Sequence, residues 1–447
     1  MEISPRITAA LASATDTKLF WLGEDLLAKT ADAFKQLFSA KRACMVADQN
    51  TLRAAGREVW GALKLGGVET VEPFIFDHPP HADIEAAEKI RKYLEEKDAI
   101  AIAVGAGSIN DICKVAAYNM GAGYLCVATA ASVDGYASSG APMTIDGFKK
   151  TVPCKAPTGI IADLGVLRKA PYALTSSGYA DLVAKVPGGA DWIIADMVGA
   201  GVEHAMQPVP WRMVQEPLNG WINRPMELKK GEPAPFADLF EGLTLSGFAM
   251  QAADSSRPAS GCEHMFSHIW EMAGVKRADG SEPSHGEKVA IGSLASTAIL
   301  ERIFAVPFTH ADTEEAARRY PSWAEREALI RKCFSGTMLE KTLAESYAKF
   351  AANEEAVKTR LAHIAEIWPE LTDCVAAQMM PFARMREMFR VAECPLRPQD
   401  IGITPERCAA TVITAQMIRA RYTVLDLAFD TGRLHEAVQA VLEVFQK

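Results

Sequence analysis

The chain has 447 residues and a mass of 48.4 kDa, which exceeds a typical single hydrophobic core, so we expect two domains. Hydrophobic residues make up 49% and charged residues 23% of the sequence, a mixture typical of soluble globular enzymes rather than disordered or fibrous proteins. A net charge of -9 argues against nucleic-acid binding. The sequence has no apolar stretch of membrane-spanning length and no signal-peptide pattern, so we expect a cytoplasmic protein rather than a membrane or secreted one.

Short apolar runs alternate with helical patterns up to about residue 170. Each run ends in turn or polar residues, as do the strands of a parallel sheet that presents ligands at their carboxyl ends. The runs cover residues 43–47, 99–104, 124–128 and 159–162. Residues 1–172 are therefore predicted to form an α/β dinucleotide-binding domain with a parallel sheet.

Two of these strand ends carry residues that are candidates for binding the cofactor. Asp48 follows the first run, where its carboxylate either accepts hydrogen bonds from a ribose hydroxyl or caps the next helix. An acidic residue there favours NAD over NADP, although nearby basic residues can reverse that preference. Thr129 and Ser132 follow the run at 124–128, and they either line the nicotinamide side or form an ordinary turn.

The segment 99–114, AIAIAVGAGSINDICK, combines a buried strand, a turn of small residues and a helix that begins at once. Small side chains let the backbone approach a pyrophosphate, and a helix N-terminus directs N–H groups and a positive dipole end toward that charge. We predict Gly105, Gly107 and Ser108 as cofactor-binding residues, together with Asp111 in the helix. The turn lacks a full GxGxxG, and such turns also serve packing alone.

From about residue 176 onward, strand signals almost vanish and helical patterns follow one another, for example at 322–334 and 341–367. Residues 173–447 are therefore predicted to form an all-helical domain. Six prolines within 207–235 exclude one continuous helix and predict a loop-rich insertion in this domain. Trp211 and Trp221 in this segment either pack it onto the core, the interpretation we favour, or cover a substrate cleft. The nine cysteines contain no CxxC pair and are expected to be reduced thiols.

Three segments of the helical domain offer metal ligands. Asp181 lies in the first turns of a helix predicted in SSGYADLVAKV. Ser260 and Glu263 match a capping box, which predicts a helix that begins near Gly261 and carries His264 and His268 on one face.

Ser284 and Glu287 match a second capping box, which predicts that His285 is the first helical residue. One carboxylate and two imidazoles suit zinc, iron(II), nickel or manganese and leave positions open for a substrate oxygen. We predict Asp181, His264 and His285 as the ligands of one divalent metal ion. His268 fits a proton-relay role behind the ligands better than a third imidazole ligand.

These segments resemble the sn-glycerol-1-phosphate dehydrogenase family, within the superfamily of iron-containing alcohol dehydrogenases and dehydroquinate synthase-like proteins. The resemblance runs in order from VGAGSINDICK through VATAASVDGYAS, SGYADLVAKVPGGADW and HGEKVAIGSL, and SRPASGCEH with RARYTVLDL indicates the bacterial branch. It implies a metal in the cleft, a homodimer, and NAD(P)-linked interconversion of dihydroxyacetone phosphate and sn-glycerol 1-phosphate. Zinc, nickel and iron are the candidate metals.

The resemblance implies the same metal ligands and pyrophosphate turn, and it adds Asp134 as a catalytic, substrate-site carboxylate. Arg257 and Lys185 are candidates for the substrate phosphate, since a guanidinium or ammonium group pairs with phosphate oxygens. Both also fit structural ion pairs, and Lys185 fits that role better.

Three alternatives remain open. One is a glycerol or other polyol dehydrogenase of the same superfamily, because the proline-rich insertion departs from the family pattern and precedes the metal histidines. Another is a dehydroquinate synthase-like lyase, which would need additional basic residues for its substrate. The third is a non-enzymatic nucleotide-binding protein, and the intact metal-ligand set argues against it.

Overall fold

The computed structural model describes residues 4–145 and 148–446, and the chain divides into two compact units. The first unit comprises Met1–Leu182 and Val209–Ser256, and the second comprises Val183–Pro208 and Arg257–Lys447. Helix α8 (Tyr172–Val183), which we expected to begin the helical domain, belongs to the first unit up to Leu182, and the chain enters the second unit at Val183. Residues 209–256, which we expected in the helical domain, group instead with the first unit.

The first unit is built on the predicted parallel sheet, which has six strands in the order β1-β8-β5-β4-β2-β3. The strands are β1 (Leu19–Gly23), β2 (Arg42–Asp48), β3 (Phe74–Phe76), β4 (Ala99–Gly105), β5 (Leu125–Ala128) and β8 (Gly159–Asp163). The four predicted strands correspond to β2, β4, β5 and β8. The two strands of this sheet that were not predicted, β1 and β3, are its edge strands, which pair on one side only.

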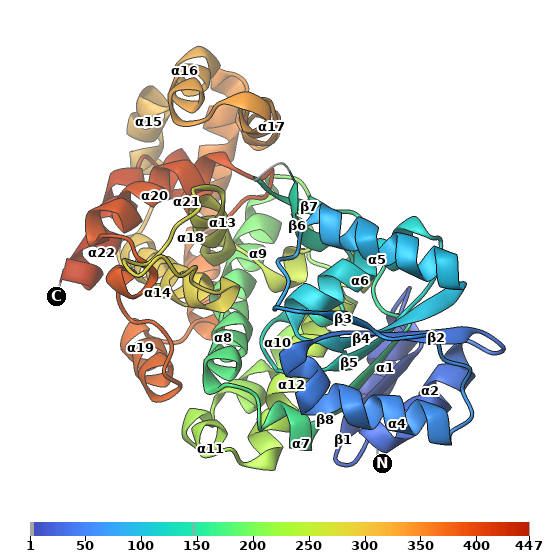
Figure 1. The fold of residues 1–447 in the computed structure, drawn as a ribbon. Helices are drawn as coiled ribbons and strands as arrows, with labels where there is room; N and C mark the ends of the chain where they lie inside the picture. The colour runs from blue at the N-terminus through green and yellow to red at the C-terminus, as the bar shows by residue number, and fades with distance from the viewer. Residues whose placement is uncertain (1–3, 146–147, 447) are drawn as a thin grey trace. The chain divides into compact units, whose positions relative to one another are not determined.

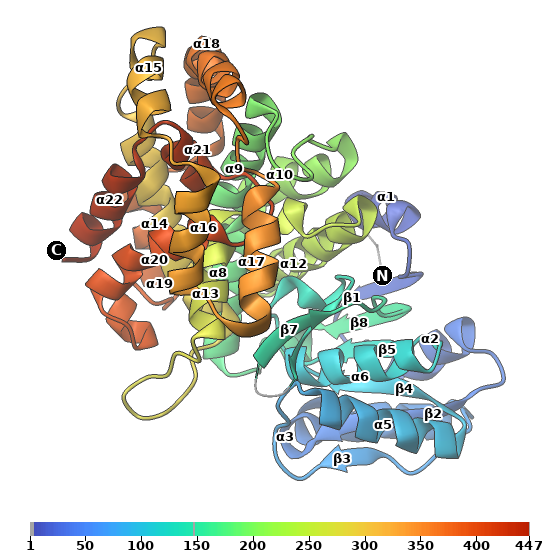
Figure 2. The ribbon, with the colours of Figure 1, turned by 90° about the horizontal axis from the view of Figure 1, so that it is seen from above.

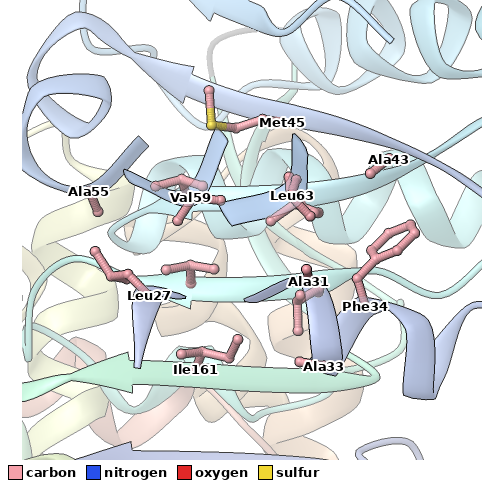
Figure 3. Close-up of a cluster of buried hydrophobic side chains, with 14 of the residues drawn as sticks. Leu27, Ala31, Ala33, Phe34, Ala43, Met45, Ala55, Val59, Leu63 and Ile161 are labelled. Atoms are coloured by element: carbon pink, nitrogen blue, oxygen red, sulfur yellow. The ribbon is translucent and has the colours of Figure 1, made fainter. Parts of the chain in front are cut away.

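Helices cover both faces of this sheet. In Figure 1, α5 (Ile84–Lys97) and α6 (Gly107–Asn119) lie above the sheet, while α2 (Thr30–Leu37) and α4 (Arg57–Leu65) lie below it. Figure 2 shows α5 and α6 side by side on their face. On the other face, Phe34 and Leu63 pack against strand residues such as Met45 and Ile161, all of them buried (Figure 3). This apolar core fixes the strand ends from which the candidate cofactor residues project.

The proline-rich segment is helical, so the predicted loop-rich insertion is wrong. It forms α10 (Pro208–Ile222), α11 (Pro225–Lys229) and the start of α12 (Pro233–Ala253). Each helix begins at a proline, because a first helical residue needs no intrahelical N–H bond and proline has the helical φ already. Trp221 is buried, and a Cβ at Gly242 of α12 would lie 2.8 Å from its ring, so this tryptophan packs inside the first unit.

The remaining elements of the first unit are short or peripheral. They are α1 (Pro5–Ser13), α3 (Gln49–Thr51), α7 (Leu164–Leu167) and an antiparallel hairpin of β6 (Ala141–Ile145) and β7 (Phe148–Val152).

The second unit contains helices, as predicted. They are α9 (Lys185–Val198), α13 (Cys262–Met272), α14 (His285–Phe304), α15 (His310–Arg319), α16 (Trp323–Cys333), α17 (Gly336–Tyr347), α18 (Glu354–Gln378), α19 (Phe382–Val391), α20 (Pro405–Met417), α21 (Val424–Asp430) and α22 (Leu434–Gln446). The pattern at 341–367 is divided between α17 and α18, because Asn353 caps a new helix. Within the described ranges, no helix has the length and apolar character needed to cross a membrane.

Candidate active site

The turn between β4 and α6 has the form expected of a phosphate-binding turn. β4 ends at Gly105, Ala106 is the N-cap, and α6 begins at Gly107 without a side-chain hydrogen bond at the cap. A Cβ at Gly105 would lie 2.4 Å from the Cβ of Ile109, whereas a Cβ at Gly107 would have no neighbour closer than 3.6 Å. Gly105 therefore serves strand–helix packing, and Gly107 keeps the backbone at the helix N-terminus accessible.

Three other predicted cofactor residues lie at this end of the sheet. The Thr129 amide donates to the Gly105 carbonyl at 3.1 Å, and Ala128 pairs with Gly105 in the parallel register of β4 and β5. Thr129 and the nearby Ser132 are buried, while Ser108 is exposed in the first turn of α6. The structure therefore brings the predicted turn and the segment after β5 together.

The two acidic residues predicted to bind cofactor both have structural partners. Asp48 Oδ1 accepts the amides of Asn50 and Thr51 at 2.7 and 2.9 Å, so the capping interpretation of Asp48 is the one observed. Asp111 forms an ion pair with buried Lys114, with 3.6 Å between its Oδ1 and the ammonium nitrogen. Any contact of these carboxylates with the cofactor would be additional to these roles.

Asp134 and Asp181 contact each other within the first unit. The Asp134 amide donates to Asp181 Oδ2 at 3.0 Å, and the Ser246 hydroxyl donates to Asp134 Oδ2 at 3.1 Å. This contact depends on Gly178, where a Cβ would lie only 2.0 Å from the carbonyl oxygen of Ala131. The glycine three residues before Asp181 thus lets α8 approach the loop that carries Asp134.

In the second unit, α13 and α14 bring His264 and His285 together, with 5.3 Å between the ring centroids. His264 Nδ1 lies 2.8 Å from Glu263 Oε1, and His285 Nδ1 lies 3.0 Å from Glu271 Oε1. Because carboxylate oxygens accept hydrogen bonds, we assign a proton to Nδ1 of each ring. Each Nε2 then has a lone pair for a metal, the arrangement found in carboxylate–histidine–metal sites.

The two predicted capping boxes have different outcomes. Ser284 caps α14 with Glu287 in a reciprocal box, and His285 is the first helical residue, as predicted. The box at Ser260 is not formed, because Gly261 is the N-cap of α13. Glu263 instead accepts the Gly261 amide at 2.7 Å, in addition to its contact with the neighbouring histidine.

His268 lies on the same helix as His264, with 6.3 Å between the centroids of the two rings. Its Nδ1 is 3.6 Å from Glu271 Oε2, and its Nε2 is 3.3 Å from Nη2 of Arg419. Burial and then the Arg419 charge lower the pKa of His268 well below its usual 6.5, so the ring is neutral at pH 7. Glu271 thus lies between His268 and His285.

The basic residues predicted for the substrate phosphate are both buried. Arg257 Nη2 donates to the backbone carbonyls of Asp191 and Tyr422, at 2.9 Å each. Arg257 therefore connects α9 to the segment before α21. Lys185, at the first position of α9, is fully buried.

Asp191 of α9 also supports the start of α13. Its carboxylate accepts the Cys262 amide at 2.6 Å, and burial followed by the Glu263 charge raises the pKa of Asp191 to about 7.

Two glutamates and one arginine that support the histidines were not predicted from the sequence. Glu263 directly precedes His264, and Glu271 follows His268 by three residues, a spacing that places side chains on one helix face. These spacings were available signals. The contact of Arg419 with His268 joins residues 151 positions apart, and no local pattern predicts it.

Known proteins are similar to this chain in sequence and in fold. The sequence profile of the family described as iron-containing alcohol dehydrogenase matches residues 21–171. The glycerol-1-phosphate dehydrogenase (NAD(P)+) of Geobacillus stearothermophilus is 31% identical over 390 residues, which cover 86% of each chain. The protein of that name from Bacillus velezensis is 38% identical over 249 residues, 55% of this chain and 62% of the relative, or just under two thirds of its length.

Solved structures show the same fold. Glycerol dehydrogenase from Schizosaccharomyces pombe superposes with a TM-score of 0.61, covering 97% of this chain and 91% of that protein at 16% identity.

Proposed function

Because the chain belongs to the glycerol-1-phosphate dehydrogenase family, we propose that it interconverts dihydroxyacetone phosphate and sn-glycerol 1-phosphate with NAD(P) and a divalent metal ion. The observation that carries this proposal is the pair of histidines whose Nδ1 atoms each face a glutamate, at 2.8 and 3.0 Å. A histidine held in this way has one protonation site fixed and the other nitrogen available to a metal.

The proposed ligands are Asp181, His264 and His285. One potential ligand atom from each of these residues lies within 4.8 Å of the other two, which supports a single shared ion. The set of one carboxylate and two imidazoles fits zinc, iron(II), nickel or manganese and leaves positions for a substrate oxygen. Asp181 and His264 are buried, so a metal there would also compensate the burial of a carboxylate.

When bound, the metal would polarise the substrate oxygen as a Lewis acid, and the nicotinamide would exchange a hydride with the adjacent carbon. Glu263 and Glu271 are proposed to orient the two imidazoles. The backbone amides from Gly107 onward, at the N-terminus of α6, are proposed to bind the cofactor pyrophosphate. Asp134 is proposed to bind a substrate hydroxyl, since its carboxylate is oriented by Ser246.

His268 is proposed as a positioning residue. Its Nδ1 faces Glu271, and Glu271 in turn faces His285, so the neutral ring helps to hold that glutamate in place.

The first experiment is an assay of NADH and NADPH oxidation by the purified full chain with dihydroxyacetone phosphate and with dihydroxyacetone. It is repeated after chelation and after addition of single divalent metals. Oxidation that requires both dihydroxyacetone phosphate and metal supports the proposal. Preference for dihydroxyacetone would favour a glycerol or polyol dehydrogenase, and no oxidation with retained nucleotide binding would refute the dehydrogenase.

The ligand set is tested by the metal content of His285→Ala, measured by elemental analysis. His435→Ala is a matched control, because His435 is exposed at the start of α22. We expect the first variant to lose metal and activity together and the control to keep both. Unchanged metal content in His285→Ala would mean that His285 is not a ligand.

A further inference from the structure

Lys114 of helix α6 has an ammonium group in the interior of the first unit. Its side chain is 0% exposed. The ammonium nitrogen donates to the carbonyls of Gly135, Ser138 and Gly140 at 2.8, 3.1 and 3.1 Å. An ammonium group has three N–H donors, so these acceptors match its full donor capacity. Asp111, at 3.6 Å on the same helix, compensates the buried charge.

The three carbonyls belong to residues 134–140, which we call the Asp134 segment. It contains one turn of 3-10 helix, η3 (Asp134–Tyr136), and is otherwise neither helix nor strand. Buried carbonyls in such a segment need hydrogen-bond partners from elsewhere in the chain. Lys114 is a partner for three of them, and the Asn110 side chain of the same helix adds a longer bond to the Gly135 carbonyl, at 3.5 Å. Helix α6 therefore holds this segment in place.

The Asp134 segment also contacts two other helices of the first unit. The Asp134 amide donates to Asp181 Oδ2 of α8 at 3.0 Å, and the Ser246 hydroxyl of α12 donates to Asp134 Oδ2 at 3.1 Å. Asp134 directly precedes the glycine whose carbonyl Lys114 contacts at the shortest of its three distances. Movement at that carbonyl would therefore displace both the amide and the carboxylate of Asp134.

Lys114 thereby joins two elements that have separate proposed roles. It lies about two turns along α6 from Gly107, where the helix N-terminus is proposed to bind the cofactor pyrophosphate. The segment that it holds carries Asp134, which is proposed to bind a substrate hydroxyl. Hydride transfer needs cofactor and substrate in one closely defined geometry, and a misplacement of about 1 Å can lower a rate about 100-fold.

We infer that Lys114 is a positioning residue, which fixes the Asp134 segment relative to the helix that binds the cofactor. A lysine that served folding alone would change stability and leave turnover of the folded protein intact. A positioning role predicts instead that folded protein loses turnover while it still binds NADH. The inference rests on the proposed function for the roles of Asp134 and of the α6 N-terminus.

A pocket beside Lys114 makes its ammonium group replaceable. Lys114 lines a pocket of about 410 Å³ together with the exposed residues Tyr118 and Lys155. Lys114→Ala removes three carbons and the nitrogen, so it leaves a space next to this pocket. Propylammonium consists of these same atoms and can donate to the three carbonyls from that space.

Three variants are compared with the wild type. Lys114→Ala removes the ammonium group. Lys114→Arg keeps a charge beside Asp111 and keeps N–H donors, but it places them on a longer planar group, so we expect it to fold and to hold the segment less accurately. Lys155→Ala is the matched control, because Lys155 is an exposed lysine of the same pocket.

Each metal-reconstituted full chain is measured in three ways. They are kcat with dihydroxyacetone phosphate, NADH affinity by fluorescence titration, and amide hydrogen exchange over residues 134–140 and 99–109. We expect kcat of Lys114→Ala to fall about 100-fold and exchange in the Asp134 segment to become faster. Propylammonium should reverse both effects, and tetramethylammonium, which has no N–H donor, should reverse neither.

The other values should stay close to those of the wild type. NADH affinity and exchange over residues 99–109 should be unchanged in both Lys114 variants, because the turn at Gly107 is intact. Lys114→Arg should lose less turnover than Lys114→Ala, and Lys155→Ala should match the wild type throughout.

The inference is overturned if both Lys114 variants turn over as the wild type does, or if they lose turnover and NADH affinity together. If Lys114→Ala does not fold, Lys114→Arg decides, and wild-type turnover in that variant overturns the inference. Failure of the proposed function is distinct. A wild type that does not reduce dihydroxyacetone phosphate would refute the proposed substrate, whereas unchanged exchange of the Asp134 segment in the Lys114 variants would refute the positioning role whatever the substrate.

Discussion

The close packing of α13 and α14 permits the contact between His264 and His285, and Gly292 permits that packing. A Cβ at Gly292 would lie 2.3 Å from the backbone oxygen of Glu263, whereas ordinary van der Waals contact begins at 3.4 Å. The obstructing atom is backbone and cannot rotate away. Gly292→Ala therefore requires the two helices to separate locally by about 1 Å, which we expect to cost about 1–3 kcal/mol of unfolding free energy.

The same displacement should weaken metal binding. Metal–nitrogen distances in such sites are confined to about 2.0–2.1 Å, so separation of the histidines strains the coordination. The assay combines chemical denaturation of the metal-free protein with metal competition against a chelator. Gly220→Ala is the control, because a Cβ at this helical glycine would meet no atom within 4 Å. If Gly292→Ala matched the wild type in both stability and metal affinity, the reasoning about this helix contact would be refuted.

Three further predictions follow from individual contacts. Glu271→Gln should weaken metal binding about 10- to 100-fold in a chelator competition, because the His285 ring loses a charged acceptor; unchanged affinity would contradict that role. Gly107→Ala should weaken NADH binding in a fluorescence titration with little loss of thermal stability, whereas Gly105→Ala should lower the thermal stability. Equal NADH affinity and equal thermal stability of the two variants would refute the separate roles of these glycines. In the native protein at pH 8, a thiol reagent should spare the buried cysteines, and burial also raises the pKa of Cys44, for example, to about 12. Labelling at all nine positions before unfolding would contradict this expectation. The thiols expected to react are Cys333 and Cys374.

Features with local signals were predictable from the sequence. The turn at Gly105 and Gly107 combines a buried strand with a helix start, and both signals lie within a few residues. The capping box at Ser284 likewise depends only on Glu287, three residues later. These elements formed as expected because the residues that specify each of them lie within a few positions of one another in the chain.

Features that depend on distant partners were not predictable. Ser260 matches a capping-box pattern, but Arg421, 161 residues away, donates to its hydroxyl, and the helix is capped one residue later. The prolines of 207–235 were interpreted as helix breakers, whereas those at the start of α10, α11 and α12 begin these helices. In each case the local pattern permits two outcomes, and tertiary contacts determine which one forms.

The central claim is tested most directly by oxidation of the two glycerol phosphate enantiomers by the metal-reconstituted protein. NAD(P)+ reduction is followed by absorbance with sn-glycerol 1-phosphate, sn-glycerol 3-phosphate and glycerol as separate substrates. We predict reduction with sn-glycerol 1-phosphate that disappears after chelation and returns with added divalent metal. Turnover of sn-glycerol 3-phosphate or glycerol in its place, or turnover unaffected by removal of the metal, would contradict the claim.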